Sequence, residues 1–274
     1  MYNQRCFDII HTILLFIGIF KDVQPINITS VNIPRLASLG TRNPVILDCD
    51  YDIGKSKNTG LVIKWYVNQE LLYQWIYGYE PKGSDEFRKY IDETYKASDD
   101  PNEMYRAVKL VRLGHELTGN VRCLISTQFD GEAEASSQML VYSPESVFRL
   151  SHPVLNEESN LLTVTCLAED LYPLPTIKLR RNRQLIEVQK QYYKNHSDGR
   201  YSIEAVGILP MSEVQLPEIF RCELTIKDAN YTSTREYLYN GGAAIVQLPR
   251  SFVIFAFVLA ITMISSLITI THTI

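Results

Sequence analysis

Short segments in which apolar and polar residues alternate recur along this chain, a pattern that predicts β-strands with one buried face. Within 62–67, for example, the alternation places Ile63, Trp65 and Val67 on the same side. The clearest segments of this kind are 46–49, 62–67, 108–113, 119–123, 136–142 and 162–166. We therefore expect an all-β protein in which each strand turns one side toward a core.

Two pairs of cysteines divide these predicted strands into two units of roughly 100 residues. Cys49 and Cys123 flank Trp65, while Cys166 and Cys222 flank a second segment with a similar sequence. The two segments, 61-LVIKWYVNQELL-72 and 175-PTIKLRRNRQLI-186, share an Ile-Lys pair, an Asn and two final aliphatic residues at matching positions. A repeat at this scale predicts tandem immunoglobulin-like sandwiches, each with a disulfide joining its two sheets.

The spacing within each cysteine pair indicates the type of sandwich. The first pair is 74 residues apart, which leaves room in a domain spanning 31–142 for the extra C′ and C″ strands of a variable-type sandwich. The second pair is 56 residues apart, which suits a constant-type domain spanning 144–239.

Three core positions, Trp65, Leu179 and Phe220, follow from that alignment. Trp65 is expected beside the first disulfide, and Leu179 stands at the matching position of the second domain. Val121 and Phe220 occupy the positions two residues before the second cysteines, where a Tyr is expected. Neither domain can therefore form the tyrosine-corner hydrogen bond.

Both ends of the chain carry apolar segments. Residues 9–20, IIHTILLFIGIF, have the length of a signal-peptide core, so we predict a signal peptide over 1–23. Residues 240–274 combine small residues, a short spacer and the apolar run 252–270. This order is typical of a glycolipid-anchor signal, with attachment at Asn240 or Gly241, and the alternative is a transmembrane helix.

The remaining extracellular signals agree with that prediction. Asn27, Asn195 and Asn230 each begin an N-x-S/T triplet, which is the acceptor sequence for N-glycosylation. The fifth cysteine, Cys6, lies in the segment that we expect to be removed, so the other four form two pairs. We expect the protein on the extracellular face of the plasma membrane.

The sequence contains few residues or motifs typical of catalytic sites. It has only 5 His and a net charge of −4, and it lacks the common metalloprotease, nucleophile-elbow and phosphate-loop motifs. The prediction is a binding protein and not an enzyme, without nucleic acid, cofactor or metal ion as a ligand.

One aromatic segment predicts a contact surface. In 72-LYQWIYGY-79, aromatic residues recur at every second position, so a strand would present them on one face together with Tyr66. Large rigid aromatic side chains often dominate interfaces. The predicted partner-binding residues are Tyr66, Tyr73, Trp75, Tyr77 and Tyr79. The alternative is that two or more of them pack into the core or under the loop 80–103.

A basic segment, 178-KLRRNR-183, predicts a second surface. Its basic residues could attract acidic glycans, and the other interpretation is an exposed strand protected from edge pairing. The candidate glycan-binding residues are Lys178, Arg180, Arg181 and Arg183.

Domain one resembles the beaten path family of neuronal immunoglobulin-superfamily proteins. The resemblance rests on 63-IKWYVNQELLYQWIYGYEP-81 and 108-VKLVRLGHELTGNVRCLIST-127, and Val121 and Leu179 mark a divergent member. It implies a ligand in axon guidance and synaptic partner choice that binds sidestep-like receptors heterophilically through its first domain. The aromatic positions that it carries over are Tyr73, Trp75 and Tyr77, with Tyr66 beside them.

The sequence thus leads to one principal hypothesis and two alternatives. The principal hypothesis is a tethered recognition protein that binds an immunoglobulin-superfamily receptor on another cell. The alternatives are a glycan-binding or matrix-binding module, which moderate salt would disrupt, and a homophilic adhesion protein.

Overall fold

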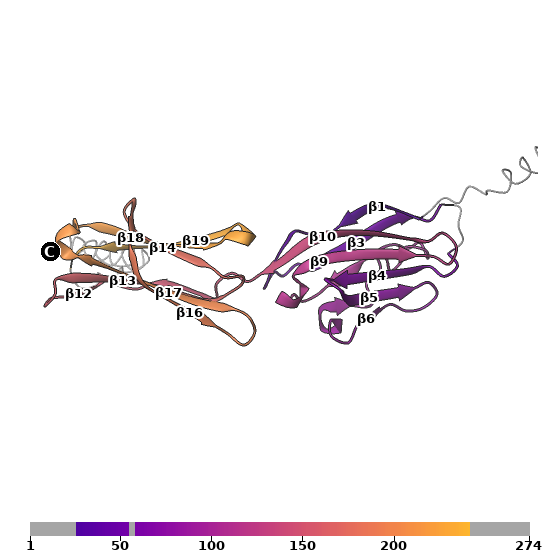
Figure 1. The fold of residues 1–274 in the computed structure, drawn as a ribbon, viewed down its shortest axis with the longest axis horizontal. Helices are drawn as coiled ribbons and strands as arrows, with labels where there is room; N and C mark the ends of the chain where they lie inside the picture. Colours follow the sequence, from indigo (N-terminus) through magenta and orange to yellow (C-terminus); the bar gives the residue numbers. More distant parts are fainter. Residues whose placement is uncertain (1–25, 55–57, 242–274) are drawn as a thin grey trace, which may run out of the picture.

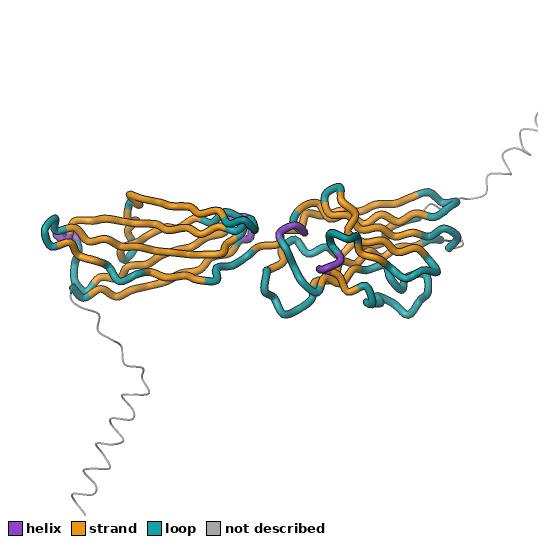
Figure 2. The backbone as a smooth tube through the Cα atoms, turned by 90° about the horizontal axis from the view of Figure 1, so that it is seen from below, coloured by secondary structure: helices purple, strands orange, loops and turns teal. Residues whose placement is uncertain are grey.

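The computed structural model describes residues 26–54 and 58–241. They form two β-sandwiches arranged end to end, and most strands run roughly along the long axis of the molecule (Figures 1 and 2). The helical elements of the described residues are single 3-10 turns of three residues each. The prediction of an all-β protein with two tandem immunoglobulin-like sandwiches is confirmed.

Domain one has the two sheets of a variable-type sandwich. The strands of the first sheet, in spatial order, are β1 (Asn27–Asn32), β3 (Val45–Asp52), β8 (Val108–Leu110) and β7 (Ile91–Asp92). Those of the second sheet are β2 (Leu36–Ser38), β10 (Glu132–Tyr142), β9 (Gly119–Ser126), β4 (Val62–Val67), β5 (Glu70–Ile76) and β6 (Lys82–Gly83). The strands β5 and β6 are the additional C′ and C″ strands that the cysteine spacing predicts.

Domain two is a smaller sandwich of the constant type. Its first sheet contains β11 (Val147–Leu150), β13 (Leu161–Leu171), β17 (Tyr201–Pro210) and β16 (Val188–Asn195), with β12 (Val154–Asn156) also paired to β13. Its second sheet contains β15 (Gln184–Ile186), β14 (Thr176–Arg181), β18 (Glu218–Ile226) and β19 (Tyr231–Tyr239). The short strand β15 is an addition to the three strands expected in this sheet.

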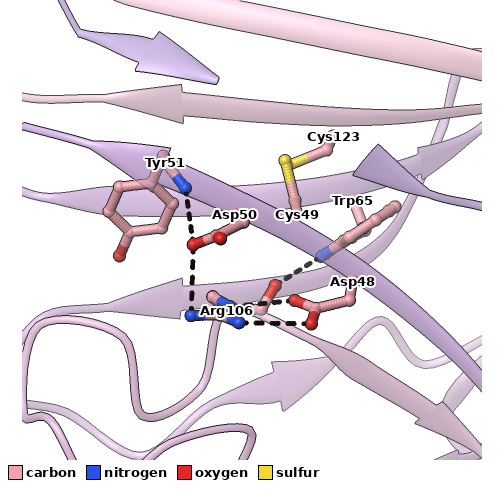
Figure 3. Close-up of a disulfide and its surroundings, with 7 residues drawn as sticks. All are labelled: Asp48, Cys49, Asp50, Tyr51, Trp65, Arg106 and Cys123. Atoms are coloured by element: carbon pink, nitrogen blue, oxygen red, sulfur yellow. Dashed lines mark hydrogen bonds and ion pairs between the residues drawn. A yellow bond between two sulfur atoms is a disulfide. The ribbon is translucent and has the colours of Figure 1, made fainter. Parts of the chain in front are cut away.

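Each domain has its own core around its own disulfide. Cys49 is bonded to Cys123 and Cys166 to Cys222, as the sequence predicts. Trp65 is completely buried in the first core, in which the indole lies beside the first disulfide (Figure 3). In the second core Leu179 and Phe220 are also completely buried, which confirms the three predicted core positions.

Candidate partner-binding face

An irregularity in the pairing of β4 with β5 decides which aromatic side chains domain one exposes. Tyr66 pairs with Leu71, but Trp65 pairs with Tyr73, so Leu72 is an extra residue on β5. Residues directly opposite each other in an antiparallel pair point to the same side of the sheet. Tyr73 therefore lies with Trp65 on the core side.

The predicted exposure of Tyr73 and Trp75 is consequently wrong. Tyr73 and Trp75 are each only 2% exposed, and Trp75 pairs with the buried Ile63. Without the extra residue, Leu72 would oppose Trp65 and the aromatic positions would face solvent. A shift of one residue moves every later side chain to the other face of the strand.

The two buried aromatic residues support the long segment between β7 and β8. The hydroxyl of Tyr73 donates a hydrogen bond of 2.9 Å to the carbonyl of Tyr105, and burial raises the pKa of Tyr73 well above its usual value. The ring of Trp75 packs edge-on against that of Tyr105 at 5.7 Å between centroids. The alternative interpretation of the aromatic segment, packing in the core and under the loop, is confirmed for these two residues.

Arg106, in the same segment, connects it to the disulfide-bearing strand (Figure 3). Its guanidinium donates to both carboxylate oxygens of Asp48, at 2.9 and 3.3 Å, and lies within 2.6 Å of Glu103 and 3.3 Å of Asp50. Its backbone carbonyl accepts a hydrogen bond of 3.0 Å from the Trp65 indole. The hydrogen bond that the Arg106 guanidinium donates to Asp48, followed by the nearby negative charges, raises the pKa of Arg106 despite its partial burial.

The substitution Tyr73→Phe should lower the free energy of unfolding of domain one by about 1–2 kcal/mol. It removes one hydrogen bond and leaves the Tyr105 carbonyl without its donor. Urea denaturation followed by tryptophan fluorescence measures the change, because the only two Trp residues are Trp65 and Trp75. The matched control is Tyr66→Phe, for which we expect a change below about 0.5 kcal/mol. Equal effects of the two substitutions would contradict the assigned role of Tyr73.

The other three predicted aromatic contacts occupy three different environments. Tyr66 is on the outer side of β4, opposite the outward Leu71. Tyr77 is half-buried against the core, with its ring 6.4 Å from that of Trp75. Tyr79 lies in the turn after β5 and is 73% exposed. The five predicted aromatic residues therefore do not form one patch.

The outer side of β10, β9, β4, β5 and β6, which we call the front face, presents a different set of side chains. At its centre the Arg122 guanidinium lies over the Tyr66 ring at 4.6 Å and pairs with Glu134 at 2.6 Å. Outward apolar residues lie on the same two strands, β4 and β9, and on β5. They are Val62, Leu71, Ile76 and Leu124.

Phe129 extends the apolar surface at the end of domain one that is farther from domain two. It lies in the turn between β9 and β10 and is 73% exposed, as is Tyr79 in the turn after β5. Sequence analysis did not identify Phe129, although an aromatic residue in the polar turn segment 127-TQFDG-131 was a signal that could have indicated it. Exposed aromatic residues in such turns are good candidates for interface contacts.

Two of the four candidate residues in the basic segment of domain two are paired with nearby carboxylates. Arg180 on β14 forms an ion pair of 2.8 Å with Glu223 on β18, and Lys178 lies opposite Glu223 in the strand register. Arg181 lies 3.7 Å from the carboxylate of Glu213. Of the four candidate glycan-binding residues, Lys178 and Arg183 are exposed. These local carboxylates reduce the positive potential that an acidic glycan would encounter.

The predicted modification sites lie at accessible positions. Asn27, Asn195 and Asn230 are all exposed, and so are Asn240 and Gly241. Glycosylation and anchor attachment at these residues remain predictions. The predicted signal peptide and most of the predicted anchor segment lie outside the described residues.

The described part of the chain adds two further observations. No helix within it has the length and hydrophobicity needed to cross a membrane. Across residues 26–54 and 58–241, no group of three or more His, Cys, Asp or Glu side chains is placed to hold a metal ion.

The two domains meet at a small aromatic junction. His115, in the turn before β9, stacks on Tyr172 of domain two with 4.1 Å between ring centroids. Beside it, the backbones of Ser143 and Tyr172 exchange two hydrogen bonds of 2.9 and 3.1 Å. Burial lowers the pKa of His115, and the nearby Asp198 backbone and the charge of Glu116 oppose that effect.

Acidification below about pH 6.5, the usual pKa of His, should loosen this junction. The docked arrangement favours neutral His115, so docking is strongest above that pH and weakens as the pH falls toward the lowered pKa. Small-angle scattering between pH 8 and 5 should show a broader range of interdomain angles at low pH. His115→Phe retains a stacking ring but does not titrate, so its scattering should stay constant. A pH response of the same size in that variant would contradict the prediction.

Comparison with known proteins defines the fold. No family model matches the chain, and no curated protein matches it. The crystal structure of bovine butyrophilin superposes with a TM-score of 0.62 at 16% identity and covers 79% of this chain and 100% of its own. The chain is a tandem immunoglobulin-fold protein. The ectodomain of mouse nectin-like molecule 4 gives a TM-score of 0.49 at 14% identity, covering 76% of this chain and 66% of its own.

Proposed function

We propose that this protein is a cell-surface recognition protein that binds another immunoglobulin-superfamily protein through the front face of domain one. The observation that carries the proposal is the composition of that face. Tyr66 and Arg122 lie at its centre, outward apolar residues lie on the same two strands and on β5, and the charged residues are Lys64 on β4, Glu132 and Glu134 on β10, and Lys82 on β6. Specific interfaces commonly combine aromatic and arginine side chains at the centre with a polar rim.

Three further features support an extracellular, tethered protein. Both domains contain a disulfide, and disulfides form and persist mainly in oxidising compartments. The acceptor asparagines are exposed, and the described chain ends at Gly241, at the end of domain two that is farther from domain one (Figure 1). A tether after Gly241 would place domain one at the end of the molecule that is farther from the membrane.

The resemblance of domain one to the beaten path family supports a more specific partner. On that basis we propose a sidestep-like receptor on an opposing cell and a role in axon guidance or synaptic partner choice. The contact residues differ from those that the resemblance alone implies, because Tyr73 and Trp75 are buried. Tyr66 and the exposed Tyr79 remain, and Ile76 and Phe129 join them.

The proposal is tested by screening the ectodomain, residues 24–241, against a panel of immunoglobulin-superfamily ectodomains at two salt concentrations. We expect a partner whose affinity falls at least 10-fold with Tyr66→Ala and Ile76→Arg combined, equivalent to about 1.4 kcal/mol or more. The matched control is Val154→Arg, which places the same charge on an exposed apolar position of domain two.

Two results would overturn the proposal. One is a partner whose binding is unchanged by the front-face substitutions but lost with Val154→Arg. The other is a lack of any protein partner together with salt-sensitive retention on a sulfated glycan that depends on Lys178 and Arg183. The second result would favour the glycan-binding hypothesis, since exposed charge pairs are screened by salt.

A further inference from the structure

One row of residues crosses all five strands of the front face. The strand registers place Glu134 on β10 beside Leu124 on β9, then Lys64 on β4, Gln74 on β5 and Lys82 on β6. With about 4.8 Å between neighbouring strands, the row is about 19 Å long. It therefore has a carboxylate at one end, an ammonium group at the other and a second ammonium group between them.

The two edges of the face carry opposite charge. Glu132 projects on the same side of β10 as Glu134, because side chains two positions apart share a face. Among the described residues, neither Glu132 nor the two lysines of the row take part in an ion pair, and Glu134, paired with Arg122, remains 57% exposed. The edge formed by β10 is thus acidic, and the part formed by β4 and β6 is basic.

This distribution discriminates between two limiting ways in which the face could pack on a second copy of itself, with the twofold axis either perpendicular or parallel to the strands. A twofold axis perpendicular to the strands would place each row on its own equivalent, so that glutamate meets glutamate and lysine meets lysine. An axis parallel to the strands instead places the β10 edge of one copy over the basic part of the other. Only the second arrangement is electrostatically complementary.

The parallel axis also fits the strand spacing. With the axis midway between β9 and β4, β10 lies over β5 of the second copy. Glu134 then faces Gln74 of the second copy, with Lys64 on one side and Lys82 on the other at one strand spacing each. Near the axis, Leu124 faces Lys64 of the second copy, and the Tyr66 ring faces the Arg122 guanidinium.

We propose that the front face pairs two copies of this chain side by side, with their long axes parallel and their carboxyl ends together. The strands of domain one run roughly along the long axis of the molecule (Figure 1), so an axis parallel to the strands relates two copies standing on the same surface. The inference rests on the proposed function in that both use the front face. Self-pairing would therefore compete with partner binding and set the number of copies available to a receptor on another cell.

A charge-exchange experiment tests the pairing directly. The ectodomain, residues 24–241, includes both sandwiches with their cores and disulfides, and its self-association is measurable by sedimentation equilibrium. Two double variants should each weaken self-association at least 10-fold. The first makes the face acidic with Lys64→Glu and Lys82→Glu, and the second makes it basic with Glu132→Lys and Glu134→Lys. An equimolar mixture of the two variants should restore association, because each basic face then meets an acidic one.

Two controls complete the experiment. Lys178→Glu with Lys190→Glu makes the same charge change at exposed positions of domain two and should leave self-association unchanged. Small-angle scattering reports the orientation, since a parallel pair has about the length of one molecule and an antiparallel pair through domain one is much longer. Partner binding is measured separately for each variant.

The outcomes separate this inference from the proposed function. A monomeric wild-type protein, association that survives both charge reversals, or an elongated antiparallel pair would each overturn the parallel pairing. If the monomer still binds a partner through the front face, the proposed function stands without self-pairing. A parallel pair that the charge exchange restores, with no receptor found in the panel, would support the inference and remove the support for heterophilic recognition.

Discussion

Replacing Arg106 by Met should lower the free energy of unfolding of domain one by about 3 kcal/mol, the low end of the range for removing one partner from a buried ion pair. The Arg106 side chain is 16% exposed, and the carboxylates around it, Asp48, Asp50 and Glu103, are 30, 43 and 32% exposed. Without the guanidinium, three negative charges remain close together. Their partial contact with water moderates the repulsion, which is why we expect the lower figure.

The substitution of Arg106 should also affect the packing around Trp65, in addition to the lost ion pairs. The backbone carbonyl of Arg106 accepts the hydrogen bond of the Trp65 indole, so a change in this segment alters the environment of the central core residue. We expect the fluorescence of the folded variant to change as well as its denaturation midpoint. Denaturation in urea, followed by tryptophan emission, gives both quantities in one experiment.

Arg88→Met provides the matched control for this prediction. Arg88 pairs with Glu93 at 3.1 Å, but its side chain is 53% exposed, and such surface pairs contribute at most about 1 kcal/mol. If the two substitutions had equal effects, Arg106 would be an ordinary surface charge. An unchanged indole spectrum in the Arg106 variant would likewise contradict the coupling to Trp65.

Removal of the second disulfide, by Cys166→Ala with Cys222→Ala, should destabilise domain two by roughly 4 kcal/mol. In the chain-entropy account, a bond that closes a loop of 56 residues restricts the unfolded chain by about that amount. A single domain is typically stable by about 5–15 kcal/mol, so the variant should be unfolded for a measurable fraction of the time at 37 °C. Differential scanning calorimetry should show a large fall in the transition temperature of one domain.

The location of the two tryptophans allows the unfolding of each domain to be followed separately in this experiment. Both lie in domain one, so the tryptophan-detected transition should stay near its wild-type midpoint while far-ultraviolet circular dichroism records the earlier unfolding of domain two. A matching downward shift of the fluorescence transition would mean that the domains unfold as one unit. The junction at His115 and Tyr172 would then be stronger than its small size implies.

The sequence was sufficient to predict the framework of the fold because the relevant signals are local or strictly spaced. Alternation around Cys49 and Trp65 identified buried faces, and the two cysteine intervals distinguished the domain types. The same alternation failed on β5, since Leu72 adds one residue to the register. A bulge of this kind depends on pairing with another strand, and the sequence of β5 alone does not reveal it.

The candidate surfaces also depend on contacts between strands that are distant in the sequence. Lys178, Arg180 and Arg181 form a conspicuous basic run in the sequence, but the carboxylate that pairs with Arg180 is Glu223 on another strand. The front face is likewise assembled from strands distant in the chain. Its row of Glu134, Lys64 and Lys82 exists only through the registers of five strands, so no window of the sequence contains it.

The irregular segment between β7 and β8 limits how the sequences of related proteins can diverge. Its backbone carbonyls at Tyr105 and Arg106 are the hydrogen-bond acceptors for Tyr73 and Trp65, two of the most deeply buried side chains of domain one. A deletion here would act as a core mutation, although the segment is irregular in structure. Duplicated copies of such a gene should therefore keep the length of this segment constant. The front face, and the two turns that carry Tyr79 and Phe129, can change freely.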